Sequence, residues 1–172
     1  MKYALIGCGR ISVNHIAAAQ ANQLDIVAIS DILPEKMDGK RQKFQLGDDT
    51  KSYTDYKEML AREKPELVAI CTESGKHAKI ALDCIDAGCH VIIEKPIALS
   101  LSDADEIISR AKTKGVKVCT NHQNRFNKSI QKIREAVEAK RFGKMFYGTA
   151  HIRWCRDENY YKQASWRGTW EQ

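Results

Sequence analysis

The stretch Tyr3-Ala-Leu-Ile-Gly-Cys-Gly-Arg-Ile-Ser12 decides the fold, because it joins an apolar run to a glycine pair and then to a helical pattern. The run Tyr3–Ile6 is typical of a buried strand. Gly7 permits a tight turn, Gly9 lets a ligand approach the backbone, and the small Ser12 lets the helix pack closely on the strand. This strand–turn–helix unit predicts a phosphate-binding loop, because the helix N-terminus offers free N–H groups and partial positive charge to an anion.

Strand-like and helix-like segments alternate from this unit onward. Strands are expected at residues 3–6, 24–30, 51–53, 67–71, 90–93 and 116–120, and helices at 11–21, from 34 onward, and at 55–62, 76–87 and 102–114. Thr54 and Ser102 are the expected N-caps, and Gly88 and Gly115 the expected C-terminal glycines. Uninterrupted Val/Ile/Leu strands favour a parallel sheet with helices on both faces. The predicted fold class is therefore α/β, with a doubly wound Rossmann sheet over residues 1–121.

Residues 122–172 differ in character and are predicted to begin a second, α+β domain for substrate binding and oligomerisation. A helix is expected from about Lys128 to Arg141, followed by a long strand of a different sheet over Lys144–Trp154. A single strand cannot bury its face. We therefore expect this second domain to be incomplete in a chain that ends at Gln172.

The composition argues against several classes of protein. Hydrophobic residues make up 43% of the chain, which favours a packed core over disorder. We expect a cytoplasmic protein without membrane contact, because the sequence contains neither a signal peptide nor an apolar run of roughly 18–20 residues. The six cysteines include no C-x-x-C pair, which favours reduced structural thiols over a metal site. The net charge of +6 is spread over stretches of mixed charge, so no nucleic-acid partner is expected.

Asp31 directly follows the second predicted strand. A carboxylate at that position can accept hydrogen bonds from the adenosine ribose hydroxyls and repel a 2′-phosphate. No arginine follows it directly, so NAD is the predicted cofactor in preference to NADP. The alternative is an ordinary turn aspartate before Ile32-Leu33-Pro34.

Glu94-Lys95-Pro96 directly follows the fifth predicted strand. Ligands of doubly wound sheets bind outside the carboxyl ends of the strands. A lysine there could take a hydroxyl proton as hydride leaves the same carbon, and a partly desolvated lysine with a pKa of roughly 7–8 suits such a base. Glu94 could orient the lysine or reach the cofactor. The alternative is a solvated ion pair after a strand.

Taken together, the motifs resemble the Gfo/Idh/MocA family of oxidoreductases, in the order Gly7-x-Gly9-x-x-Ser12, Asp31, Glu94-Lys95-Pro96, Asn124-Arg125-Phe126 and Trp166-Arg167. The resemblance covers essentially the whole chain. It implies NAD(P)-dependent chemistry at a carbon of a sugar, sugar-nucleotide or cyclitol substrate, and a homo-oligomer for the complete protein. The segment from Tyr160 to Trp170 resembles members that act on UDP-N-acetylhexosamine-type acids, as 3-dehydrogenases in lipopolysaccharide biosynthesis.

The resemblance also implies roles for individual residues. Lys95 is the implied catalytic proton acceptor, and the Lys95–Pro96 bond is implied to be cis. The implied cofactor-binding residues are Gly7, Cys8, Gly9, Arg10, Ile11, Asp31, Thr72, His77, Glu94, Lys95, Asn124, Trp166 and Arg167. By itself, His77 would be a surface histidine at a helix N-terminus, and Trp166 and Arg167 would be ordinary packing and surface charge. The remaining histidines are assigned no role: His15, His90, His122 and His151.

The end of the chain departs from the family pattern, and the family fold also allows a second function. The family continues with a glycine-rich stretch and an Asp-x-x-x-His motif, whereas this chain ends at Gln172. We therefore expect it to bind cofactor without a full active site. The rival is a non-catalytic NAD-binding sensor of the same fold, but an intact Glu94-Lys95-Pro96 argues against it, because a sensor needs no proton acceptor.

Overall fold

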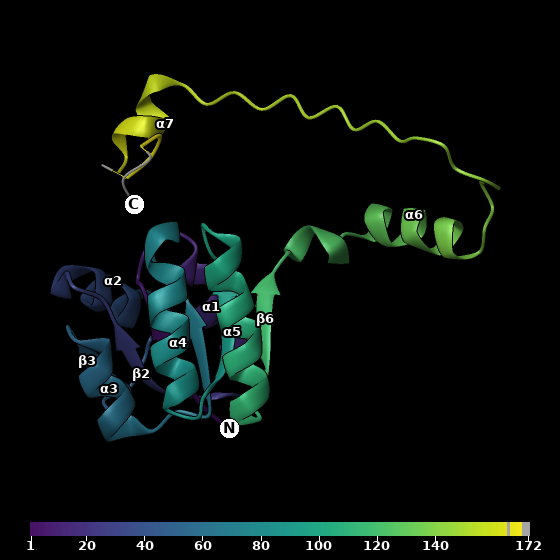
Figure 1. The fold of residues 1–172 in the computed structure, drawn as a ribbon. Helices are drawn as coiled ribbons and strands as arrows, with labels where there is room; N and C mark the ends of the chain where they lie inside the picture. Colours follow the sequence, from purple (N-terminus) through teal and green to yellow (C-terminus); the bar gives the residue numbers. More distant parts are fainter. Residues whose placement is uncertain (165, 170–172) are drawn as a thin grey trace. The chain divides into compact units, whose positions relative to one another are not determined.

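Six parallel strands form the centre of the first part of the chain, in a computed structural model that describes residues 1–164 and 166–169. The strands are β1 Lys2–Ile6, β2 Asp25–Ser30, β3 Lys51–Tyr53, β4 Leu67–Ile70, β5 His90–Glu94 and β6 Val118–Asn121. Their order in the sheet is β3-β2-β1-β4-β5-β6, and Figure 1 shows β3 and β2 on one side of the sheet and β6 on the other. This order confirms the predicted doubly wound Rossmann sheet.

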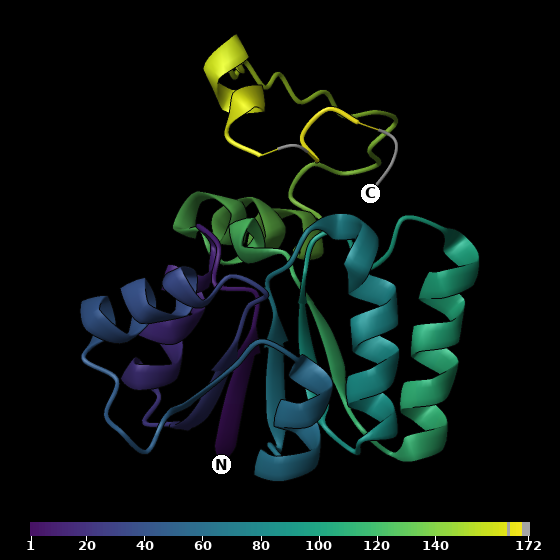
Figure 2. The same ribbon diagram turned by 90° about the vertical axis from the view of Figure 1, so that its left-hand side faces the viewer.

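Five helices cover the two faces of this sheet (Figure 2). They are α1 Ser12–Ala21, α2 Pro34–Phe44, α3 Tyr56–Glu63, α4 His77–Asp86 and α5 Leu101–Lys114, with a short 3-10 turn η1 at Ser74–Lys76. Successive side chains of a strand point to opposite faces. Tyr3 and Leu5 of β1 accordingly pack with α1 and α2, whereas Ala4 and Ile6 pack with α3, α4 and α5.

Two of the helices begin at caps other than the predicted ones. Asp55, not Thr54, caps α3 by accepting a 2.8 Å hydrogen bond from the Lys57 nitrogen. Ser100, not Ser102, caps α5 by accepting a 3.1 Å hydrogen bond from the Asp103 nitrogen. A cap needs extended backbone and an oxygen two or three residues before a free N–H, and Ser102 already lies inside the first turn. The predicted glycine ends are confirmed, with φ angles of +83° at Gly88 and +69° at Gly115.

The residues from His122 onward form a separate unit by their contacts. Its elements are a 3-10 turn η2 at Gln123–Phe126, α6 Lys128–Glu138 and α7 Glu158–Lys162. The strand predicted over Lys144–Trp154 is wrong, because residues 144–154 form no strand. A strand exists only through hydrogen bonds to a neighbour, and the described residues of this unit contain no other strand. Trp170, within the segment compared with sugar-nucleotide enzymes, lies outside the described residues.

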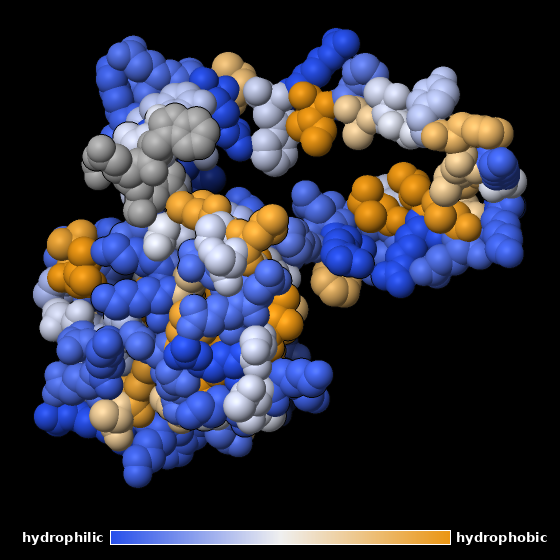
Figure 3. Space-filling view, viewed as in Figure 1, coloured by the Kyte–Doolittle hydropathy of each residue, from blue (hydrophilic) through white to orange (hydrophobic). Residues whose placement is uncertain are grey.

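The surface of the second unit carries apolar side chains. Ile130, Ile133 and Val137 follow one another at helical spacing along α6 and remain 43%, 55% and 38% exposed. Figure 3 shows this apolar stripe against charged neighbours. Within the described part of the chain, no helix has the length and apolar character needed to cross a bilayer.

The six cysteines are all free thiols. Cys8, Cys71, Cys84 and Cys89 are buried, whereas Cys119 and Cys155 are exposed. Burial raises the pKa of all four buried thiols, to about 12 for Cys8 and about 11 for Cys89. These four therefore behave as small apolar side chains of the core.

Candidate functional site

The loop between β1 and α1 has a different requirement at each of its two glycines. At Gly7, φ is +94°, and a Cβ atom would lie 2.7 Å from the main-chain carbon of Cys71 and 2.8 Å from the nitrogen of Thr72. No side chain fits there. At Gly9, an added Cβ would meet nothing within 4 Å among the described residues. The first glycine thus allows the turn against the end of β4, and the second leaves the backbone open to a ligand.

The N-terminus of α1 directly follows this loop and lacks a side-chain cap. Ile11 occupies the N-cap position, and no described side chain accepts a hydrogen bond from the first-turn N–H groups. Ser12 is fully buried, and its hydroxyl donates a 2.6 Å hydrogen bond to the Gly9 carbonyl, which fixes the loop to the helix. Uncapped N–H groups at a helix N-terminus suit the phosphates of a dinucleotide.

Asp31 at the end of β2 faces the same loop. Its Oδ2 accepts a 2.7 Å hydrogen bond from the Cys8 nitrogen, and its Oδ1 accepts one of 3.0 Å from the Leu33 nitrogen. The second contact is the local turn contact of the alternative interpretation, and the first is a long-range contact with the phosphate loop. Because a carboxylate has about four acceptor sites, Asp31 can still accept a ribose hydroxyl, which stays a prediction.

Glu94 at the end of β5 is held by two donors. His15 Nε2 lies 2.8 Å from Glu94 Oε1, and Asn121 Nδ2 donates to the same oxygen over 2.6 Å. Glu94 and His15 are buried, with 6% and 9% of their surface exposed. Burial raises the pKa of Glu94, but the hydrogen bonds from His15 and Asn121 and the nearby charge of Lys95 outweigh it and lower the net pKa. Glu94 is therefore a carboxylate at neutral pH.

The motif pattern assigns no role to His15 or Asn121. Ser12, His15 and Ile16 lie on the buried side of α1, and this helical spacing is the feature of the sequence that could have marked His15 as buried. The signal for Asn121 is the register of β5 and β6, which pairs it with Glu94. Both features can be used to find these residues only once the positions of the strands and of α1 are known.

Lys95 and Pro96 directly follow the last residue of β5. The Lys95–Pro96 peptide bond is cis, as the resemblance implies. The Lys95 side chain is exposed, and its ammonium group makes no hydrogen bond or ion pair within the described residues. The chain itself therefore does not supply the partial desolvation that a lysine base requires.

His77 is buried, with 1% of its surface exposed, so its interpretation as a surface histidine is wrong. Its Nδ1 lies 2.7 Å from the Pro96 carbonyl oxygen, and its Nε2 lies 3.1 Å from that of Thr72. The ring therefore joins the loop after β4 to the turn after β5. Both ring nitrogens face the main chain, and a direct contact of His77 with cofactor stays a prediction.

The structure brings most of the predicted site residues of the first unit to the carboxyl ends of β1, β2, β4 and β5, where ligands of such sheets bind. These are Gly7, Cys8, Gly9, Asp31, Thr72, His77, Glu94 and Lys95, with Arg10 and Ile11 in the loop before α1. Asn124, Trp166 and Arg167 belong to the second unit. The Arg167 guanidinium lies 4.4 Å from the ring centroid of Tyr160 and 4.8 Å from that of Trp166. Their cofactor contacts stay predictions.

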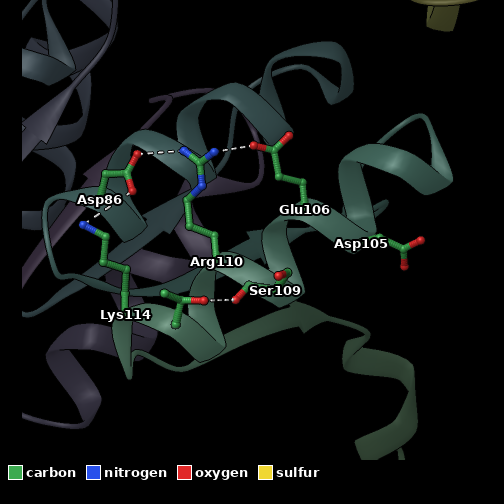
Figure 4. A pocket seen from close by; sticks show the side chains of 7 residues that line it. Asp86, Asp105, Glu106, Ser109, Arg110 and Lys114 are labelled. Atoms are coloured by element: carbon green, nitrogen blue, oxygen red, sulfur yellow. Dashed lines mark hydrogen bonds and ion pairs between the residues drawn. The ribbon is translucent and has the colours of Figure 1, made fainter.

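A hollow on the outer side of α4 and α5, away from the candidate site, is lined by charged side chains (Figure 4). Arg110 pairs with Asp86 over 2.8 Å and also with Glu106, and Lys114 lies 3.7 Å from Asp86. These side chains are 37–47% exposed, so water screens their charges. We assign this hollow to helix–helix contact.

Comparison with known proteins places the geometry in a family. The profile of the Gfo/Idh/MocA family, described as an oxidoreductase family with an NAD-binding Rossmann fold, matches residues 1–122. A myo-inositol 2-dehydrogenase of Thermotoga maritima is 32% identical over 147 residues, which are 84% of this chain and 42% of that protein.

Two crystal structures of WlbA dehydrogenases in complex with NADH and UDP-GlcNAcA are similar over 99% of this chain. The one from Chromobacterium violaceum has a TM-score of 0.92 and 32% identity, and 49% of it is covered. The one from Bordetella pertussis has a TM-score of 0.91 and 34% identity, and 51% of it is covered. The chain thus spans about half the length of these relatives or somewhat less. By these matches, the chain belongs to the Gfo/Idh/MocA family of oxidoreductases and carries its NAD-binding Rossmann fold.

Proposed function

We propose that this chain is the cofactor-binding part of an NAD-dependent dehydrogenase that oxidises a hydroxyl group of a sugar, sugar nucleotide or cyclitol. The observation that carries the proposal is the arrangement at one edge of the sheet. There, the open Gly9 backbone, the Asp31 carboxylate and the Lys95 side chain follow β1, β2 and β5. These are the groups needed for pyrophosphate, adenosine ribose and a substrate hydroxyl, respectively.

The proposed division of labour follows from these positions. The uncapped N-terminus of α1 binds the pyrophosphate, and Asp31 accepts hydrogen bonds from the adenosine ribose while disfavouring a 2′-phosphate. NAD supplies a hydride acceptor when bound. Lys95 receives the proton of the substrate hydroxyl, and the bound cofactor and substrate exclude water from its otherwise exposed side chain. Asn124, Trp166 and Arg167 contribute further cofactor contacts from the second unit.

The substrate we propose is a UDP-N-acetylhexosamine-type acid, oxidised at its 3-position in polysaccharide biosynthesis. Support comes from the WlbA dehydrogenases, whose complexes hold UDP-GlcNAcA and which are 32% and 34% identical to this chain. We also propose that residues 1–121 and 122–172 are the NAD-binding domain and the beginning of a substrate domain, and that the complete protein is a homo-oligomer. Six free thiols favour the reducing cytoplasm as its compartment.

The cofactor assignment is tested by titrating this chain with NADH and with NADPH while following the fluorescence of the dihydronicotinamide. We expect NADH to bind more tightly. Tighter binding of NADPH would contradict the role of Asp31, and binding of neither would contradict the cofactor site.

The test of the dehydrogenase assignment requires a protein in which this chain is joined to the part of a relative that it does not cover. We expect it to reduce NAD in the presence of UDP-GlcNAcA, and we expect Lys95→Ala to abolish turnover while NADH still binds. Tight NAD binding without hydride transfer to any sugar, sugar nucleotide or cyclitol would favour the non-catalytic sensor instead. Full activity of Lys95→Ala would remove the lysine from the mechanism.

A further inference from the structure

Two buried histidines contact the two residues that flank Lys95. His15 reaches Glu94 from α1, and His77 reaches Pro96 from α4. These helices pack on opposite faces of the sheet (Figure 2). We propose that His15 and His77 are positioning residues, which together fix the backbone and orientation of Lys95. The functional meaning of this arrangement rests on the proposed role of Lys95 as proton acceptor.

On one side, His15 connects Lys95 to the phosphate loop. Ser12 bonds to the Gly9 carbonyl, and His15 follows one turn later on the buried side of the same helix. Because Glu94 is ionised, its oxygen accepts, and His15 must carry its hydrogen on Nε2. Asn121 of β6 donates to the same oxygen, so the carboxylate is held by neighbours in two elements. The phosphate loop and the residue before Lys95 are thus both tied to α1, by Ser12 and His15 respectively.

On the other side, His77 holds the carbonyl of the residue that follows Lys95. Each ring nitrogen faces a carbonyl oxygen, and carbonyl oxygens only accept hydrogen bonds. A neutral imidazole has one N–H, which belongs on Nδ1 because the contact with Pro96 is the shorter one, at 2.7 Å against 3.1 Å. An imidazolium would donate to both. The ring is 1% exposed, so the His77 side of this contact is shielded from water.

The two histidines therefore differ in the ring nitrogen that contacts a neighbour of Lys95. It is Nε2 in His15 and Nδ1 in His77. An ordinary structural role would require only a polar side chain of similar size at each position. The positioning role requires a donor at one particular ring position, and the two positions are opposite.

This difference gives a crossed set of variants. The amide nitrogen of glutamine lies near the place of histidine Nε2, and that of asparagine lies near the place of Nδ1. His15→Gln and His77→Asn therefore keep the contacts with Glu94 and Pro96. His15→Asn and His77→Gln lose them, although each has the same functional group as its matched control.

The readout is the backbone amide NMR signal of Lys95 in the whole 172-residue chain with isotope-labelled lysine. The signal is assigned by its loss in Lys95→Arg. We expect His15→Gln and His77→Asn to leave the amide chemical shift of Lys95 as in the wild type. We expect His15→Asn and His77→Gln to move it, at temperatures well below their melting transitions. The same Lys95 signal in all four variants, or equal changes for Gln and Asn at each position, would overturn the proposal.

A measurement on the wild type keeps the test valid if a variant fails to fold. Imidazole ¹⁵N shifts and slowly exchanging ring protons report which nitrogen carries hydrogen. We expect a proton on Nε2 of His15 and on Nδ1 of His77, and a neutral ring with the opposite tautomer at either site would refute the contact. None of these readouts requires NADH. Failure of the wild type to bind NADH would therefore count against the proposed function alone, and an unresponsive Lys95 against the positioning role alone.

Discussion

The main-chain nitrogen of Cys8 donates a 2.7 Å hydrogen bond to Oδ2 of Asp31 and so joins the loop after β1 to the end of β2. One side chain therefore both shapes the phosphate loop and presents a negative charge beside it. The two contributions can be separated by substitution.

Asp31→Asn retains an oxygen that can accept from Cys8 but removes the charge. We expect the preference for NADH over NADPH to fall by about tenfold or more, since charge-assisted hydrogen bonds are roughly twice as strong as neutral ones. Asp31→Ala should weaken both cofactors, because the loop also loses its contact. Fluorescence titration of each variant with each cofactor measures this, and an unchanged preference in Asp31→Asn would contradict the role of the charge.

Gly7→Ala and Gly9→Ala should act on different properties. A Cβ at position 7 would lie 2.7 Å from the Cys71 carbon at a φ of +94°, so we expect a loss of at least about 1–3 kcal/mol in the free energy of unfolding. Position 9 has open space around it, so we expect little change in stability and weaker NADH binding. Urea unfolding and NADH titration compare the two, and equal destabilisation by both would contradict the assignment.

Ser100 and Ser102 provide a matched pair at the start of α5. Ser100 accepts a hydrogen bond from the Asp103 nitrogen, so Ser100→Ala should lower the free energy of unfolding by about 1 kcal/mol. Ser102→Ala removes only a contact of 3.0 Å with the Ser100 hydroxyl and should cost less than about 0.5 kcal/mol. Urea unfolding measures both values. A larger loss for Ser102→Ala would show instead that Ser102 is the N-cap, as predicted from the sequence.

Glu94 should make stability depend on pH in the acid range. Burial raises its pKa, but the hydrogen bonds from His15 and Asn121 outweigh this effect, so the folded-state pKa lies below the ordinary value of 4.5. A lowered folded-state pKa gives a stabilisation that is complete above the ordinary pKa and is lost as pH falls through the folded-state pKa. The stability difference between wild type and Glu94→Gln should therefore shrink on acidification below about pH 4.5. Urea midpoints across this range measure it, and a difference independent of pH would be evidence against an ionised Glu94.

The cysteines should divide by exposure in an alkylation experiment. Cys119 and Cys155 are exposed, whereas the other four thiols are buried with raised pKa values. Because the thiolate is the reactive form, we expect brief treatment with a maleimide to modify two cysteines in the folded chain and six in denaturant. Intact mass spectrometry counts the additions, and modification of Cys8 in the native protein would show that the phosphate loop opens.

The sheet could be predicted from the sequence because its signals are local. Apolar runs, helical periodicity and C-terminal glycines each depend on a few neighbouring residues, and the glycine pair at Gly7 and Gly9 marks one turn. The strand expected over Lys144–Trp154 has similar local alternation but does not form. Pairing depends on a second strand, which the described part of that unit lacks, and β-propensity alone does not replace it.

The candidate site was less predictable where it depends on long-range packing. Glu94 and Lys95 are found by motif, but the contact of Glu94 with His15 joins residues far apart in the sequence and depends on where α1 lies on the sheet. The burial of His77 between two carbonyls likewise depends on the distance between two loops. The exact cap residues were missed for a smaller reason, because serine or threonine near a helix start fits several positions equally well.

The central place of β1 has a consequence for the order of folding. Tyr3 of β1 pairs with Leu67 of β4 on one side and with Ile26 of β2 on the other. During synthesis, the first strand leaves the ribosome with a partner soon available on its β2 side, while its β4 side stays open until residue 70 has emerged. An apolar strand with an open edge is a template for wrong pairing. Until β4 has emerged, the strand at the middle of the finished sheet is therefore an open edge that can pair wrongly.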